Sequence, residues 1–245
     1  MPFPFADPIF LDPQVNLEFP DPRDFDDDGL IAGGGDLSPQ RLLKAYRQGI
    51  FPWYSEEPIL WWSPNPRAIL NLDSLHISRS LKRRLRNNSF RVSVNQAPER
   101  VMDGCAQRPE GTWLTPEMKS SYLELFRRGH LMSYEVWRDE DLVGGLYGVL
   151  VGRVFAAESK FHRATDASKV ALVCALTQLS MAGLEIFDVQ FQTEHLASLG
   201  VFEIPRNVYV ERVQASSERP LDWGPVPEQY ALSCTDLLPW VRTTL

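Results

Sequence analysis

The stretch Leu131–Glu158 reads LMSYEVWRDEDLVGGLYGVLVGRVFAAE and contains three apolar runs separated by turn residues. Residues 131–138 and 142–150 each have the length and composition of a strand, and the polar turn between them predicts a hairpin. Residues 153–158 form a third run of the same type. The stretch therefore predicts a three-stranded meander.

A buried helix and another strand follow the meander. Residues 167–181 are apolar on nearly all sides, which predicts a helix enclosed by the rest of the molecule. Asp166 stands before this helix as the expected cap, and residues 184–190 have the composition of a strand. Three strands, a helix and a strand predict an α+β fold with a mixed central sheet.

Shorter helices are expected before the meander. Residues 38–49 and 115–129 each begin with a hydroxyl side chain and a proline, which favour a helix start, and residues 78–88 form a third short helix. The first 37 residues are expected to be extended chain with turns. Residues 51–67 contain four prolines and three tryptophans, which predicts an ordered aromatic loop without regular structure.

Composition and charge narrow the function classes. The net charge of −7 disfavours a general nucleic-acid-binding protein, but residues 1–40 hold nine acids and one base. Residues 41–245 therefore carry 24 bases and 23 acids, or +1, and can support a basic patch. Neither a signal peptide nor a membrane helix is expected, and three widely spaced cysteines predict reduced thiols. We expect a cytoplasmic protein without a metal site.

The order of elements resembles the core of the N-acetyltransferase (acyl-CoA N-acyltransferase) superfold. In that superfold a glycine-rich loop before the long helix binds the pyrophosphate of coenzyme A. The corresponding residues 162–168 contain no glycine and place Asp166 where a phosphate would approach, so no cofactor is expected. We expect residues 1–66 to form a small N-terminal domain and residues 67–245 the acyltransferase-like domain with a C-terminal tail.

Nine collinear blocks carry a more specific resemblance. They are GGDLSPQRLLKAYRQGIFPW (34–53), PILWWSPNPR (58–67), LHISRSLKR (75–83), GTWLTPEM (111–118), GHLMSYEVW (129–137), LVGGLYGV (142–149), ESKFHRATDASKVAL (158–172), HLASLG (195–200) and EIPR (203–206). In this order they resemble the leucyl/phenylalanyl-tRNA–protein transferase family. The resemblance implies an enzyme that moves leucine, phenylalanine and less well methionine from aminoacyl-tRNA to the N-terminal Arg or Lys of acceptor proteins. Those proteins are thereby marked for degradation. The enzyme itself is expected to be a monomer.

The residues that match the family's catalytic positions are Asp188, Gln190 and Glu158. Asp188 and Gln190 are two apart on a predicted strand and are expected on one face. The resemblance implies that they form a proton relay for the attacking amine, and that Glu158 holds a substrate amino or ribose group by a charge-assisted bond. The alternative from the residues alone is an exposed strand end and a surface ion pair.

Aromatic and apolar residues match the family's contacts with the charged tRNA end. Trp53, Trp113 and Tyr122 would contact the terminal adenosine, although most tryptophans serve packing. The pocket for the transferred side chain would be lined by Leu146, Phe155, Leu172, Leu179 and Phe187. All five are equally typical of an ordinary core.

A basic cluster lies on the predicted helix at residues 78–88. Arg79, Arg83 and Arg86 share the face opposite its apolar side, which suits the phosphates of a tRNA acceptor stem or only a solvated surface. The family's basic patch falls on the same residues. Two other functions stay open at this point: coenzyme A-dependent N-acyl transfer, and a non-catalytic tRNA-binding module.

Overall fold

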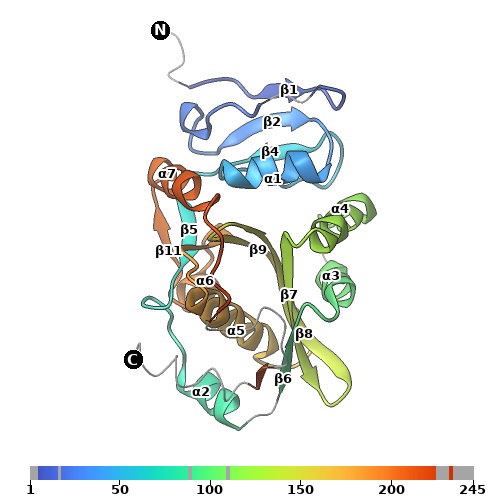
Figure 1. Cartoon of the computed structure of the whole chain (residues 1–245), viewed down its shortest axis with the longest axis vertical. Helices are drawn as coiled ribbons and strands as arrows, with labels where there is room; N and C mark the ends of the chain where they lie inside the picture. The colour runs from blue at the N-terminus through green and yellow to red at the C-terminus, as the bar shows by residue number, and fades with distance from the viewer. Residues whose placement is uncertain (1–4, 16–17, 88–89, 109–110, 225–231, 234–245) are drawn as a thin grey trace.

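The computed structural model describes residues 5–15, 18–87, 90–108, 111–224 and 232–233. They form an α+β molecule with two sheets, one of four strands from residues 9–62 and one of eight strands from residues 67–233. In Figure 1 the smaller sheet lies at the top, above the larger sheet and its helices.

The larger sheet contains the predicted meander. Its strands, in spatial order, are β11 (Phe202–Ile204), β5 (Arg67–Leu70), β10 (Ile186–Gln190), β9 (Val154–His162), β8 (Asp141–Val151), β7 (Leu131–Arg138), β6 (Arg91–Val94) and β12 (Leu232–Ser233). Strands β9 and β10 pair in parallel and the other neighbours pair antiparallel. The meander at β7–β9 and the mixed sheet are thus confirmed.

Helix α5 (Ala167–Met181) connects the two parallel strands and is buried over most of its length, as predicted. The expected cap is wrong. Asp166 stands at the N-cap position with φ 69°, in the left-handed region, and its side chain makes no hydrogen bond to the helix backbone. Its carboxylate instead lies 3.1 Å from the Lys169 ammonium.

Helices cover both faces of the larger sheet. Helices α2 (Arg79–Arg86) and α5 pack on one face, and α3 (Pro98–Ala106) and α4 (Pro116–Arg127) on the other. Alternation along the strands serves both cores, since Leu146 packs with α5 and Tyr147 with α4.

The smaller sheet was not expected from the sequence. It consists of β1 (Ile9–Leu11), β2 (Leu30–Gly34), β4 (Leu60–Trp62) and β3 (Phe51–Pro52), in that order. The prediction of no regular structure in 51–67 is therefore wrong, because this segment contains β3 and β4. The first 37 residues were expected to be extended chain with turns, and two of their extended segments pair as β1 and β2. These strands are two to five residues long and depend on partners distant in the chain, so local composition does not reveal them.

The remaining elements are helical. They are η1 (Pro22–Asp24), α1 (Pro39–Arg47), α6 (Glu194–Ala197) and α7 (Arg206–Ser216). The predicted helix starts at α1, α2 and α4 are confirmed, because the hydroxyls of Ser38, Ser78 and Thr115 each accept a backbone N–H of the first turn.

Candidate active site

A cavity of about 420 Å³ opens where β9 and β10 separate. Their parallel pairing extends only to Asp188 and Ala156, while β9 continues to His162. The lining residues are Phe51, Pro52, Trp53, Arg108, Trp113, Leu146, Ala157, Glu158, Ser159, Lys160, Leu172, Val189, Gln190, Phe191, Thr193 and Leu196. Six residues predicted for three different roles thus meet in one cavity.

Gln190 ends β10 with an unusual backbone. Its φ is 59° and the pairing register with β5 shifts between Asp188 and Gln190, so simple alternation does not hold across this pair. The carboxamide satisfies its neighbours when its nitrogen donates to the carbonyl oxygens of Val189 and Ala157, both at 3.1 Å. Because both amide protons are then engaged, Gln190 has its carbonyl oxygen left as an acceptor.

Asp188 is buried beside the cavity and is held from three sides. Arg67 donates to both of its oxygens, from Nε at 2.8 Å and from Nη2 at 2.7 Å. The Tyr209 hydroxyl donates at 2.9 Å, and the backbone N–H of Gln190 donates at 2.9 Å. The carboxylate is therefore a fixed anion that holds the backbone of Gln190 in place.

Arg67 was missed by sequence reasoning. Its guanidinium lies between the rings of Phe51 and Tyr209, 4.7 and 4.5 Å from their centroids. Burial works to lower the pKa of Arg67, but the Asp188 carboxylate outweighs it and raises that pKa, so the guanidinium stays charged. Arg67 ends the block PNPR, whose composition does not indicate a buried cation, and its partner Asp188 is 121 residues away.

Glu158 stands at the end of a chain of buried hydroxyls. The Tyr122 hydroxyl donates to its Oε2 at 2.9 Å, and the Tyr46 hydroxyl lies 3.0 Å from that of Tyr122. Its other oxygen, Oε1, is buried with no hydrogen-bond partner among the described residues. Burial raises the pKa of Glu158 to about 7, although both tyrosines oppose the shift.

Tyr122 has a different place from the one expected. Its side chain is 0% exposed and does not line the cavity, so its ring cannot stack on a base in this structure. The ring packs edge-on against Tyr147. Tyr122 thus contacts Glu158 through its hydroxyl, on the buried side of the cavity wall. A motif comparison could not distinguish this role from direct contact with adenosine.

The mouth of the cavity carries exposed aromatic rings. Trp53 is 45% exposed and Phe191 39%, and their centroids lie 5.4 Å apart. Trp113 lines the same cavity, and both tryptophans also line a neighbouring hollow of about 560 Å³. Phe191 was missed, since a single phenylalanine after a strand carries no signal. Large apolar side chains left in solvent are typical of a binding surface.

The five residues predicted for the side-chain pocket divide into two groups. Leu146 and Leu172 line the cavity. Phe155, Leu179 and Phe187 are buried in the core behind it, with the Phe155 and Phe187 rings 5.1 Å apart. Their effect on a bound side chain would therefore be through the shape of the wall.

The predicted basic face lies away from this cavity. Arg79, Arg83 and Arg86 are exposed on α2 while Leu81 and Leu85 are buried. None of the three arginines lines the cavity, and α2 lies at the end of the molecule opposite the smaller sheet (Figure 1).

Two other kinds of site are absent from the described part of the chain. Within residues 5–224, apart from the short gaps, no three histidine, cysteine or acidic side chains group closely enough for a metal ion. Across the same residues no helix has the length and apolar character of a membrane span.

Comparisons with known proteins agree closely with one another. The family model described as leucyl/phenylalanyl-tRNA protein transferase matches residues 69–214, and that of its N-terminal domain matches residues 35–65. A protein of Pseudoalteromonas atlantica named leucyl/phenylalanyl-tRNA–protein transferase is 49% identical over 213 residues, which are 84% of this chain and 91% of that one. One of the same name from Anaeromyxobacter sp. (strain K) is 49% identical over 218 residues, 87% and 93% of the two chains.

Among solved structures the similarity is weaker. The structure of L-PGS from Bacillus licheniformis aligns with a TM-score of 0.37 and 12% identity, covering 87% of this chain and 72% of that chain.

Proposed function

Because this chain belongs to the leucyl/phenylalanyl-tRNA–protein transferase family, it is an aminoacyltransferase, and we propose the substrates and residue roles that follow. The donor is Leu-tRNA or Phe-tRNA, with Met-tRNA a poorer one. The acceptor is a protein with N-terminal Arg or Lys, which the transfer marks for degradation. Both substrates place the reaction in the cytoplasm, and the enzyme acts as a monomer without a cofactor.

The donor end occupies the cavity between β9 and β10. Stacking of the terminal adenine on Trp53 and Trp113 would contribute about 1–3 kcal/mol. The transferred side chain lies against Leu146 and Leu172, where the rigid wall formed by Phe155, Leu179 and Phe187 disfavours branching at Cβ. This discrimination is worth about 1–3 kcal/mol for each methylene group. This placement of the donor end is supported by the cavity lining, because the two tryptophans and the two leucines line one cavity of about 420 Å³.

The reaction joins the acceptor amine to the aminoacyl carbonyl carbon. The neutral α-amine attacks, a C–N bond forms, and the ester C–O bond breaks. The amine loses one proton and the released ribose oxygen takes one up, so tRNA leaves with a free hydroxyl. An ester is already activated and an α-amine has a pKa of about 7.7–8.0, so positioning and proton transfer suffice.

Gln190 is the residue closest to this proton transfer in our proposal. Its carbonyl oxygen accepts a hydrogen bond from the attacking amine, because its nitrogen is held by two backbone carbonyls. Asp188 is a positioning residue that fixes the Gln190 backbone. Glu158 offers the unpaired Oε1 to the donor amino group or ribose, and Tyr122 holds its other oxygen.

The tRNA stem and the fold complete the proposal. Arg79, Arg83 and Arg86 on α2 contact acceptor-stem phosphates without sequence preference. We also place the boundary between the small N-terminal and the catalytic domain at residues 66/67, where the smaller sheet has ended and β5 begins. The order β7–β8–β9–α5–β10, with β9 and β10 parallel, supports an N-acetyltransferase-like core.

One assay tests the function. The protein is incubated with labelled Leu-tRNA and an Arg-initiated peptide, with and without ribonuclease. Label is expected in the peptide only when tRNA is intact, and absence of any transfer would refute the assigned substrates.

The role of Gln190 is tested in the same assay. Gln190→Ala should lower kcat roughly 100-fold or more while tRNA binding is kept. Gln192→Ala is the matched control, because its amide bonds to the Val201 carbonyl and it does not line the cavity. A fully active Gln190→Ala would remove Gln190 from the chemistry without changing the reaction.

A further inference from the structure

A second cavity, of about 410 Å³, adjoins the first. It lies between α3, the end of β9 and the short helix α6. Its lining residues are Gly104, Gln107, Arg108, Lys160, Phe161, His162, Arg163, Ser168 and His195. None of the roles proposed for the first cavity uses this space.

Three cationic side chains line this cavity, and within the described part of the chain the hydrogen-bond partners of its two arginines are neutral. Arg108 donates to the Cys105 carbonyl at 3.1 Å and to the Ser159 hydroxyl at 2.9 Å. Arg163 donates to the Gln107 carboxamide at 2.7 Å and to the Leu142 carbonyl at 3.4 Å. The third cation is Lys160.

No acidic side chain among the described lining residues compensates this charge. None of the described residues that line the cavity is an aspartate or glutamate, although the whole chain carries −7. Burial and then the Arg108 charge lower the pKa of the Lys160 ammonium. Like charges held together in a partly enclosed space are unfavourable until an anion enters, so the cavity has the electrostatics of an anion site.

The two cavities are continuous along β9. Arg108 and Lys160 line both of them, and the strand passes from Glu158 in the first to His162 in the second. Four residues of a strand span about 13 Å. A polymer with one negative charge in each repeating unit, whose end lies in the first cavity, can therefore continue into the second and meet its positive charges.

We propose that this basic cavity binds the phosphodiester groups of the nucleotides that precede the terminal adenosine of the donor tRNA. The inference rests on the proposed function, which places that adenosine in the first cavity. It also gives the acceptor a direction of approach, because an N-terminal Arg or Lys is repelled by Arg108, Lys160 and Arg163.

The site differs from the proposed stem contact on α2. Single-stranded nucleotides would enter here, and none of the α2 arginines lines either cavity. The same phosphate chemistry could come from a free phosphate or pyrophosphate, and a carboxylate of the acceptor peptide is a further anion. The test separates these sources.

The experiment compares two minimal donors on the full-length protein. Leucyl-adenosine carries no phosphate, whereas the leucyl ester of the trinucleotide C-C-A carries two. Arg163→Gln is the test variant, since Arg163 lines only the second cavity. Arg212→Gln is the control, because Arg212 is exposed on α7 and lines neither cavity.

Arg163→Gln should raise KM for the trinucleotide donor roughly tenfold, as expected when a charge-assisted bond is removed. KM for leucyl-adenosine and for the peptide should stay within about twofold, and Arg163→Lys should recover most of the affinity. The logarithmic salt dependence of KM for the trinucleotide should fall by about 0.7 for each phosphate that the variant no longer neutralises. Transfer from leucyl-adenosine also reports that the variant is folded.

Several outcomes would overturn the inference. An equal rise in KM with both donors would mean a structural role, and no rise with either would mean that no phosphate is bound. A raised KM for the peptide alone would assign the cavity to acceptor carboxylates. Inorganic pyrophosphate could inhibit transfer from leucyl-adenosine while Arg163→Gln changes KM for neither donor. That result would mean that the cavity binds a free anion and not the donor. If the wild type transfers from neither minimal donor nor from intact Leu-tRNA, the proposed function fails instead; transfer from Leu-tRNA that is equally lowered by Arg163→Gln and Arg212→Gln would overturn only the inference about this cavity.

Discussion

At the scale of single residues, the buried pair Arg67–Asp188 stands behind Gln190 and does not itself line the cavity. Both side chains are almost completely buried, and the pair is completed by Tyr209 and the Gln190 backbone. A buried carboxylate is tolerated only when its lone pairs are matched by donors. The positive φ of Gln190 and its carbonyl orientation thus depend on an arginine from another strand.

We predict that Arg67→Leu lowers the free energy of unfolding by about 3–5 kcal/mol, because it leaves the Asp188 charge buried and unpaired. Urea unfolding at constant pH measures this. The double variant Arg67→Leu/Asp188→Leu should recover a large part of the stability, since neither charge is then left alone. Additive effects in the two single variants and the double variant would contradict the coupling.

The raised pKa of Glu158 leads us to predict a specific pH dependence of kcat/KM. Its pKa is raised to about 7, so the carboxylate that we propose to hold the donor becomes protonated as pH falls through that value. The acceptor amine also becomes protonated there. Below pH 7, log kcat/KM of the wild type should therefore fall with a slope steeper by about one than that of Glu158→Gln. Equal slopes in both proteins would exclude a titrating Glu158 from donor binding.

At the scale of elements, the cavity lies where the pairing of β9 with β10 ends. The sequence predicts both strands from their composition, but the end of their pairing depends on the register shift at Gln190 and on the competing partner β5. Helix α2 is the opposite case. Its cap, its buried Leu81 and Leu85 and its exposed arginines all follow from local pattern.

We predict that replacing Arg79, Arg83 and Arg86 by glutamine weakens tRNA binding and lowers the slope of log affinity against log salt by roughly 2 to 3, given about 0.9 for each duplex phosphate. Filter binding at several salt concentrations measures this. A control with the same charge change replaces Arg127, Arg128 and Arg212, which lie on or beside α4 and on α7. Equal slopes for the two triple variants would show that α2 contributes only general charge.

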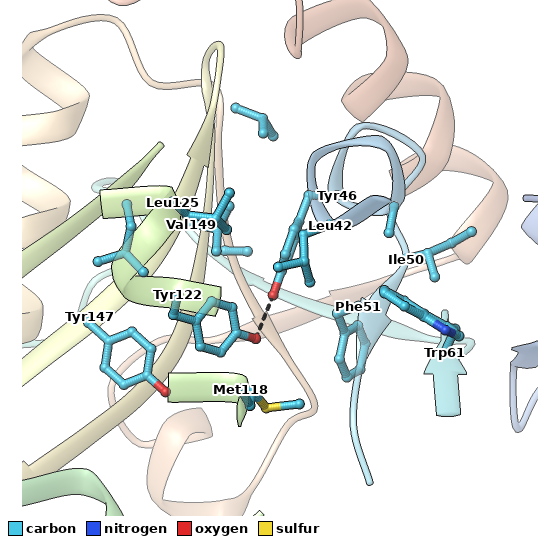
Figure 2. Close-up of a cluster of buried hydrophobic side chains, with 14 of the residues drawn as sticks. Leu42, Tyr46, Ile50, Phe51, Trp61, Met118, Tyr122, Leu125, Tyr147 and Val149 are labelled. Atoms are coloured by element: carbon cyan, nitrogen blue, oxygen red, sulfur yellow. Dashed lines mark hydrogen bonds between the residues drawn. The ribbon is translucent and has the colours of Figure 1, made fainter. Parts of the chain in front are cut away.

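At the scale of the whole molecule, the smaller sheet and the larger sheet share one core. Figure 2 shows Leu42, Tyr46 and Phe51 facing Tyr122 and Val149 across this core. One hydroxyl pair, Tyr46 with Tyr122, also crosses it at 3.0 Å. The N-terminal part therefore supplies both Trp53 at the cavity mouth and the support of Glu158.

We predict that the molecule unfolds as one cooperative unit. Leu42→Ala, at a fully buried position, should cost about 2–5 kcal/mol and shift the tryptophan fluorescence and far-ultraviolet circular dichroism transitions together. Val15→Ala is the surface control and should stay within about 0.5 kcal/mol. Two separate transitions, of which Leu42→Ala moves only one, would contradict the shared core.

The sequence by itself determined the features that local pattern controls. The meander, the enclosed α5, the capped helices and the basic face of α2 arise from periodicity and capping within one segment. The family blocks likewise identified residues that line the cavity, such as Trp53, Glu158 and Gln190.

Only the tertiary structure decided how those residues are used. Arg67 pairs with Asp188, 121 residues away, and the Tyr122 hydroxyl donates to Glu158. Arg108 and Arg163, from the segments that follow α3 and β9, line one cavity. Burial, pairing and shared cavities depend on contacts between distant segments. The free energy of such contacts is not encoded in the spacing of neighbouring residues. For this reason the sequence predicted neither the smaller sheet nor the second cavity.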